Sequence, residues 1–213
     1  MTSRIPYLPR RRALGMLAAL AFIGGGGPSL AFESQPVLVA IDTDAGTMIV
    51  EIDVAHAPAT AANFLKHVDQ GSYAGGSFYR AVTPATDRGK PPIAVIQGGR
   101  GLKPDDTVAS IAHEPTSQTG LRHRDGTISM ARGAPGTAAT EFFICIGDQP
   151  ALDAGGTRNP DSLGFAAFGR VVSGMDLVRA IQSRRADGPA SDPYVEGQML
   201  NPPVTIITAR RQP

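Results

Sequence analysis

From residue 37 to residue 209 the apolar residues fall in short runs, and turns rich in glycine and proline separate these runs. Val37–Asp44 and Gly46–Asp53 alternate apolar and polar residues around a turn at Asp44–Gly46, which predicts a β-hairpin. The further candidate strands are Ser77–Val82, Ile93–Gln97, Gly126–Ala131, Glu141–Ile146, Phe165–Val171 and Val204–Ala209. Many short strands and few helices predict an all-β barrel or sandwich, and a closed barrel would leave no exposed sheet edge.

Two segments have helical periodicity. After Pro58, apolar residues recur at helical spacing up to Val68, and Gly71 follows, which predicts a helix over Pro58–Gln70. A second helix is predicted over Gly174–Ser183. The long connections are Thr83–Pro92, Gly101–Asp125 and Asp153–Gly164. Long loops in a compact domain are often functional.

The first 31 residues differ from the rest of the chain. They hold four arginines and no acidic residue, followed by the apolar run Ala13–Ile23 and a glycine-rich break that ends at Ala31. This order predicts a secretory signal peptide over 1–31, with one domain over 32–213 in the periplasm or secreted. The apolar run is shorter than the ~20 residues that span a bilayer, so we expect no stable membrane anchor after cleavage. Arg10–Arg12 also resembles a twin-arginine signal, and a disordered basic tail or a mitochondrial presequence are the alternatives.

Charge and cysteine content exclude several classes of function. The chain has 213 residues, with 20 basic and 19 acidic side chains. Cleavage after Ala31 would leave 182 residues with 16 basic and 19 acidic side chains, a formal charge of −3. This argues against a nucleic-acid partner. The single cysteine, Cys145, excludes a disulfide framework and a cysteine-based zinc cluster, and we expect it in the core.

An ordered set of motifs spans nearly all of residues 32–213. The stretches are F-Y-R at Phe78–Arg80, V-I-Q-G-G at Val95–Gly99, I-S-M-A-R at Ile128–Arg132, E-F-F-I-C-I-G at Glu141–Gly147 and F-A-A-F-G-R at Phe165–Arg170. In order and type they resemble the cyclophilins, which are peptidyl-prolyl cis-trans isomerases. The resemblance implies a mainly β fold: a closed eight-stranded antiparallel barrel capped by two helices, with a substrate groove outside the barrel.

The resemblance also implies a site. Arg80 matches the catalytic arginine, Gln97 the glutamine that orients it, and Phe143 the floor of the proline pocket. The implied substrate-binding residues are Ala94, Val95, Ala131, Arg132, Glu141, Leu152 and Phe165. Phe142 and Phe143 are adjacent on a strand, so one should fill the barrel and the other should face the groove.

This chemistry breaks no bond, so it needs no metal, cofactor or nucleophile. A peptide bond twisted out of resonance makes the proline nitrogen a better acceptor, and a guanidinium can donate to it. We therefore expect isomerase activity on proline-containing polypeptides during the folding of exported proteins, by a monomer.

Four departures from the family pattern fall around the groove. Ala94 stands where most cyclophilins have phenylalanine, and Ala151 where many have an aromatic residue. Glu141 replaces the common glutamine and could pair with Arg80 or Arg132. Two inserted loops, Thr83–Pro92 and Ala154–Gly164, should border the groove.

Three alternatives stay open from the residues alone. Ala94 and Glu141 favour a peptide-binding chaperone or scaffold with little isomerase activity. A hydrolase lacks support, because the chain has no G-x-S-x-G motif and its histidines show no triad-like spacing. A metal site could form from His113, Glu114 and His123.

Overall fold

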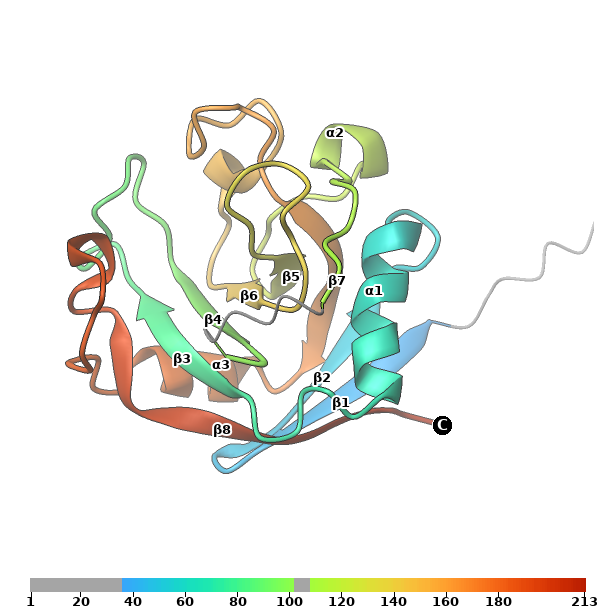
Figure 1. The fold of residues 1–213 in the computed structure, drawn as a ribbon, viewed down its shortest axis with the longest axis horizontal. Helices are drawn as coiled ribbons and strands as arrows, with labels where there is room; N and C mark the ends of the chain where they lie inside the picture. Colours follow the sequence, from blue (N-terminus) through green and yellow to red (C-terminus); the bar gives the residue numbers. More distant parts are fainter. Residues whose placement is uncertain (1–35, 102–107) are drawn as a thin grey trace, which may run out of the picture. The chain divides into compact units, whose positions relative to one another are not determined.

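Eight strands close into one antiparallel barrel in the computed structural model, which describes residues 36–101 and 108–213 (Figure 1). The strands are β1 Val37–Thr43, β2 Gly46–Ile52, β3 Ser77–Val82, β4 Val95–Gly99, β5 Thr127–Met130, β6 Phe142–Cys145, β7 Ala166–Ser173 and β8 Met199–Arg211. Their order around the barrel is β1-β2-β7-β5-β6-β4-β3-β8. The predicted mainly β, closed eight-stranded barrel is confirmed.

Within the described residues, both expected helices are present and a third, one-turn helix accompanies them. They are α1 Pro58–Asp69, α2 Thr116–Thr119 and α3 Met175–Gln182, and Figure 1 shows α1 and α3 on different sides of the barrel. Two 3₁₀ turns, η1 Pro150–Leu152 and η2 Pro193–Val195, lie in the later connections. Helix α2 is a single turn inside the connection 101–125, too short to show helical periodicity in the sequence.

The last strand begins earlier than predicted. The expected start was Val204, directly after Pro202 and Pro203, which have no N–H to donate to a sheet ladder. In the structure β8 begins at Met199. Its register with β3 shifts between the pair Phe78–Val204 and the pair Arg80–Met199, and the two prolines lie in the part of β8 where the register shifts. This early start brings the residue before Met199 next to Arg80.

The barrel interior is a cluster of aromatic rings centred on Phe142. Its ring meets Phe64, Tyr73 and Phe78 edge-on, with centroids 5.6, 5.6 and 5.7 Å away. Phe143 belongs to a second apolar cluster outside this core, so the predicted division between the two phenylalanines is confirmed. Cys145 is buried as expected, and burial raises the pKa of its thiol.

Helix α1 is capped by a residue far away in the sequence. Ala57 at its N-cap offers no side-chain acceptor. The buried carboxylate of Glu114 accepts instead from the amides of Ala59 (3.1 Å) and Thr60 (2.7 Å) and from the Thr60 hydroxyl (2.6 Å). A carboxylate is favourable at a helix N-terminus, because it satisfies free amides and complements the helix dipole. Glu114 therefore serves the fold.

The predicted signal peptide lies outside the described residues. Within 36–101 and 108–213, no helix has the length and apolarity needed to cross a bilayer. The compact unit formed by the barrel and its helices comprises Gln35–Pro213.

Candidate active site

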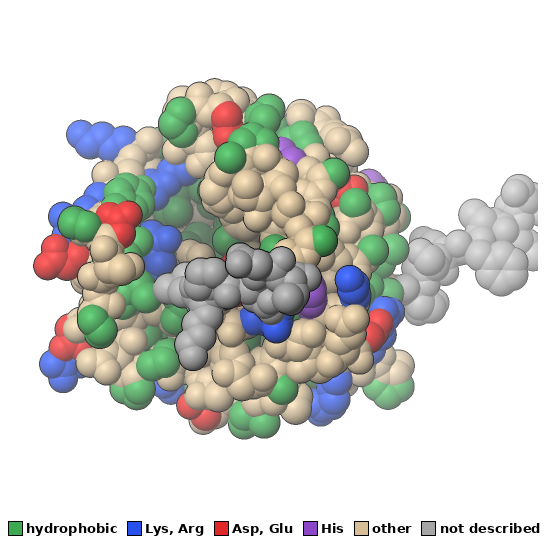
Figure 2. Space-filling model, in the orientation of Figure 1, with side chains coloured by type: hydrophobic (Ala, Val, Ile, Leu, Met, Phe, Trp, Pro, Cys, Tyr) green, Lys and Arg blue, Asp and Glu red, His purple; other side chains and the backbone are tan. Residues whose placement is uncertain are grey.

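A cavity of about 250 Å³ opens beside β3, β4 and β6 and brings together most of the predicted site residues. Figure 2 shows the hollowed face, with basic side chains along one side of the hollow. Its lining includes the predicted residues Arg80, Val95, Gln97, Ala131, Arg132, Phe143, Leu152 and Phe165. Arg158 and Asn159, which also line it, come from the predicted loop Ala154–Gly164. The remaining lining residues, which the sequence did not point to, are Val82, Ile93 and Tyr194.

The floor of the cavity is apolar. Phe143 is buried, and the ring of Phe165 meets it edge-on at 5.3 Å. Val82, Ile93, Val95 and Leu152 complete this cluster. Such a surface suits a small apolar ring.

Ala94 does not line the cavity, contrary to the expectation that it forms part of the proline pocket. Side chains alternate along an extended chain, so Ile93 and Val95 face the cavity together and Ala94 does not. The carbonyl of Ala94 accepts from the amide of Ile146 at 2.9 Å. Ile93 therefore forms part of the cavity wall. The difference from the family pattern at Ala94 did not indicate this role of Ile93.

Arg80 lies on β3 with its guanidinium at the cavity, held by neutral acceptors. Its Nη1 donates to Oε1 of Gln97 at 3.1 Å. Its Nε and Nη2 donate to Oε1 of Gln198 at 2.8 and 2.5 Å. Among the described residues these bonds use three of its five N–H donors, and no carboxylate binds it. Burial lowers the pKa of Arg80. The N–H donors that these bonds leave unused can bind a substrate.

Glu141 pairs with neither Arg80 nor Arg132 among the described residues. Its Oε1 accepts from the Gly101 amide and the Thr140 hydroxyl, each at 3.2 Å, and its Oε2 is buried without a hydrogen-bond partner there. Burial raises the pKa of this carboxyl group, against hydrogen bonds that lower it. Glu141 lines a second cavity of about 270 Å³, which shares Gln97, Ala131 and Arg132 with the first.

Arg132 holds the inserted loop 154–164. Its guanidinium makes two bonds to the carboxylate of Asp161, at 2.8 and 2.9 Å, donates to the Gly164 carbonyl, and lies 5.3 Å from the centre of the Phe165 ring. These bonds lower the pKa of Asp161 to about 2. The Arg132 side chain is 1% exposed, and its charge is paired with Asp161 of the protein itself.

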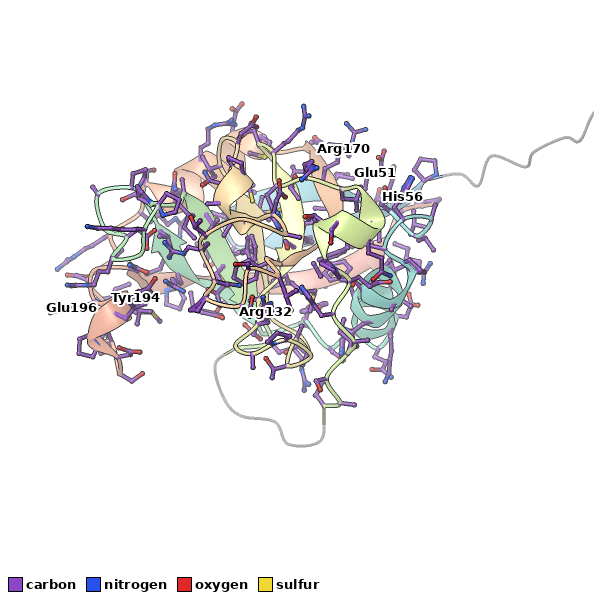
Figure 3. The ribbon with its side chains drawn as sticks, turned by 90° about the horizontal axis from the view of Figure 1, so that it is seen from above. Glu51, His56, Arg132, Arg170, Tyr194 and Glu196 are labelled. Carbon is purple, nitrogen blue, oxygen red and sulfur yellow. The ribbon has the colours of Figure 1, made fainter. Side chains whose placement is uncertain are left out.

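A buried ion pair joins the two inserted loops. Arg158 donates to both oxygens of Asp87, at 2.7 and 2.8 Å, and to the Tyr194 hydroxyl at 2.8 Å. Asp87 also accepts from the amides of Gly89 and Ile93. Although burial opposes ionisation, these bonds lower the pKa of Asp87. The loop 154–164 lines the cavity through Arg158 and Asn159, whereas the lining residues next to the loop 83–92 are Val82 and Ile93, which flank it. Figure 3 labels Tyr194, on the short segment next to Glu196, and Arg132 nearer the middle of the molecule.

A buried Ser–His–Asp chain lies beneath Phe143, and the sequence spacing did not reveal it. Nδ1 of His123 lies 2.8 Å from Asp153 and its Nε2 lies 2.9 Å from the Ser129 hydroxyl, while its ring stacks on Phe143 at 5.9 Å. Ser129 is fully buried and cannot meet a substrate, so the chain supports the floor of the cavity.

The residues of the suggested metal site have separate roles. Glu114 caps α1, His123 bonds to Asp153 and Ser129, and His113 contacts the Leu163 carbonyl. Among the described residues, no three histidine, cysteine or acidic side chains form a group that could hold a metal ion.

Comparison with known proteins decides the family. The model of the cyclophilin-type peptidyl-prolyl cis-trans isomerases matches residues 38–210. The chain belongs to the cyclophilin family. This cyclophilin is a peptidyl-prolyl cis-trans isomerase, whose family acts on proline-containing peptides.

Relatives and a solved structure agree with this assignment. A peptidyl-prolyl cis-trans isomerase of Acinetobacter baylyi is 32% identical over 199 residues, 92% of this chain and 96% of the relative. The isomerase cyp18 of Streptomyces antibioticus is 37% identical over 149 residues, 68% of this chain and 82% of the relative. A cyclophilin-type isomerase of Cryptosporidium parvum shares the fold with a TM-score of 0.62 at 19% identity, covering 84% of this chain and 98% of the other.

Proposed function

We propose that this isomerase accelerates the folding of exported proteins by rotating X-Pro bonds through Arg80. The uncatalysed rotation has a barrier of ~18–20 kcal/mol and takes tens to hundreds of seconds at X-Pro bonds. The substrates of an exported isomerase would be secreted chains whose folding is limited by this slow rotation. The basic, acid-free leader supports export.

The single observation that carries the catalytic proposal is the place of the Arg80 guanidinium. It faces the cavity floored by Phe143, with free N–H donors and no bound carboxylate among the described residues. In the twisted transition state the proline nitrogen accepts a hydrogen bond that the planar ground state does not offer. An interaction confined to the transition state raises the rate.

The apolar floor holds the proline ring while the preceding residue turns. Phe143, Leu152 and Val95 supply this surface. The C. parvum relative was studied in the presence of the dipeptide Ala-Pro. We expect the same class of ligand, a small residue followed by proline, to bind this cavity.

The test compares the wild type with Arg80→Ala and Arg80→Lys on an X-Pro peptide, using residues 32–213. A charged hydrogen bond contributes about 1.5–3 kcal/mol, so kcat/KM should fall about 10- to 100-fold in both variants. Arg80→Lys should not rescue, because an ammonium cannot keep the planar set of bonds to Gln97 and Gln198. Arg170→Ala is the matched control, since Arg170 is an exposed strand residue paired with Glu51.

Two results would contradict the proposal in different ways. Unchanged rates in Arg80→Ala would exclude the mechanism. Peptide binding by the wild type without acceleration would instead favour the chaperone or scaffold.

A further inference from the structure

We propose that Gln198 is the positioning residue that fixes the orientation of the Arg80 guanidinium. This inference rests on the proposed catalytic role of Arg80. The side-chain oxygen of Gln198 accepts from both Nε (2.8 Å) and Nη2 (2.5 Å) of Arg80. One acceptor shared by two donors on the same edge of a rigid planar group sets the direction of that edge.

Gln97 holds the same guanidinium less completely. It accepts one bond, from Nη1 at 3.1 Å, and donates to the Tyr79 hydroxyl at 2.9 Å. A single bond to a terminal nitrogen leaves the plane free to rotate about it. Gln198 removes that freedom.

The amide of Gln198 is itself held in one orientation. The residue is fully buried. Its Nε2 donates to the carbonyls of Thr86 (2.8 Å) and Tyr194 (3.4 Å), and its own backbone carbonyl accepts from the Ala81 amide at 2.9 Å. Two carbonyls on one side require the NH₂ group there, so the oxygen must face Arg80.

These contacts connect Arg80 to the wall of the groove. Thr86 lies in the inserted loop 83–92, and the Tyr194 hydroxyl binds Arg158 of the second inserted loop. A neutral amide also holds the guanidinium without neutralising it, whereas a carboxylate would compete with the substrate for its donors. The position of the Arg80 guanidinium therefore depends, through Gln198, on the positions of the inserted loops.

The test is a double-mutant cycle between Gln198→Met and Arg80→Ala, assayed on an X-Pro peptide with the full chain. Methionine keeps the length of the side chain and removes the acceptor. In the wild-type background we expect kcat to fall about tenfold with KM changed less than twofold, because binding to the apolar floor is untouched. In the Arg80→Ala background we expect no further loss. Gln149→Met is the control, since Gln149 is also buried and donates to one carbonyl, that of Ile146.

A merely structural role for Gln198 would give a different pattern. An equal loss of kcat in the wild-type and Arg80→Ala backgrounds, or a rise in KM, would overturn the inference. If Arg80→Ala lowers kcat and Gln198→Met does not, only the inference about Gln198 is wrong; if Arg80→Ala has no effect, the proposed mechanism itself fails. Should Gln198→Met not fold, Gln198→Asn keeps a polar amide that is too short to reach both sides, and the same cycle decides.

Discussion

Glu141 is a carboxylate in a position that disfavours its charge. Burial raises its pKa above the ordinary value of 4.5. Well below pH 4.5 the group is protonated in both the folded and the unfolded chain. As the pH rises above 4.5 the unfolded chain loses this proton first, so ionisation favours unfolding until the folded group has also titrated.

Replacing Glu141 by glutamine should therefore stabilise the protein at neutral pH. The amide oxygen can still accept from Gly101 and Thr140, and no buried charge remains. We expect a gain of about 1 kcal/mol in the free energy of unfolding at pH 7–8 and almost none at pH 4, measured by denaturant titration. Glu196→Gln, at an exposed position, should show no such pH dependence. Equal stability of wild type and Glu141→Gln across this range would contradict the prediction.

Phe142 and Phe143 should separate stability from activity. Phe142→Ala removes a ring that meets three others in the core, so the free energy of unfolding should fall by about 3–5 kcal/mol while KM stays near the wild-type value. Phe143→Ala enlarges an existing cavity, so the loss of stability should be smaller and KM should rise about tenfold. Denaturant unfolding and steady-state kinetics on both variants check this. A larger stability loss in Phe143→Ala would reverse the assignment.

At the level of residues, the sequence predicts what alternation and type determine. The opposite facing of Phe142 and Phe143 follows from strand geometry, and Arg80, Gln97 and Phe143 meet at the cavity as the family pattern implies. Gln198 has no such signal, because its place depends on an unexpected register shift in β8. The place of Ile93 in the cavity and the bonds of Arg132 to Asp161 and Gly164 involve the inserted loops, whose paths no local pattern specifies.

The two inserted loops act as one element because Asp87 and Arg158 join them. The side chains of this pair are 0% and 7% exposed. Removing one partner leaves the other charge buried and unpaired, which costs about 3–5 kcal/mol. The Asp87→Ala variant should lose about 3 kcal/mol of unfolding free energy, whereas Asp87→Ala/Arg158→Met should recover much of that loss.

Kinetics on the same variants measure the role of the loops at the cavity, since Arg158 and Tyr194 line it. We expect Asp87→Ala to raise KM several-fold. Glu196→Ala breaks the exposed pair with Arg88 and should change stability by less than about 0.5 kcal/mol. A double variant as unstable as Asp87→Ala would show that the charge pair is not the cause.

Elements with a strong local pattern were predicted well, and the errors have physical causes. The first hairpin, α1 and α3 lie within two residues of their predicted ends. Helix α2 is too short for periodicity. The start of β8 was missed because the two prolines, which break the pattern of a regular strand, fall at a register shift in its pairing with β3.

For the whole molecule, the leader should be dispensable for folding and activity. All eight strands lie after residue 36, so residues 32–213 should show the same melting temperature and kcat/KM as the full chain. Expressed with its leader in a Gram-negative host, the protein should accumulate in the periplasm with Phe32 as its first residue, as determined by N-terminal sequencing. Uncleaved protein in the cytoplasm would contradict the export proposal.

The closing seam of the barrel lies between the first strand and the last. Val39 of β1 pairs with Arg211 of β8, and the amide of Gln212 donates to the Leu38 carbonyl at 2.8 Å. The barrel therefore cannot close until residues up to Arg211 have left the ribosome. If export threads the chain through the membrane unfolded, β8 must emerge before the sheet is complete. An enzyme that speeds the folding of other chains would then itself depend on a late contact between its first and last strands.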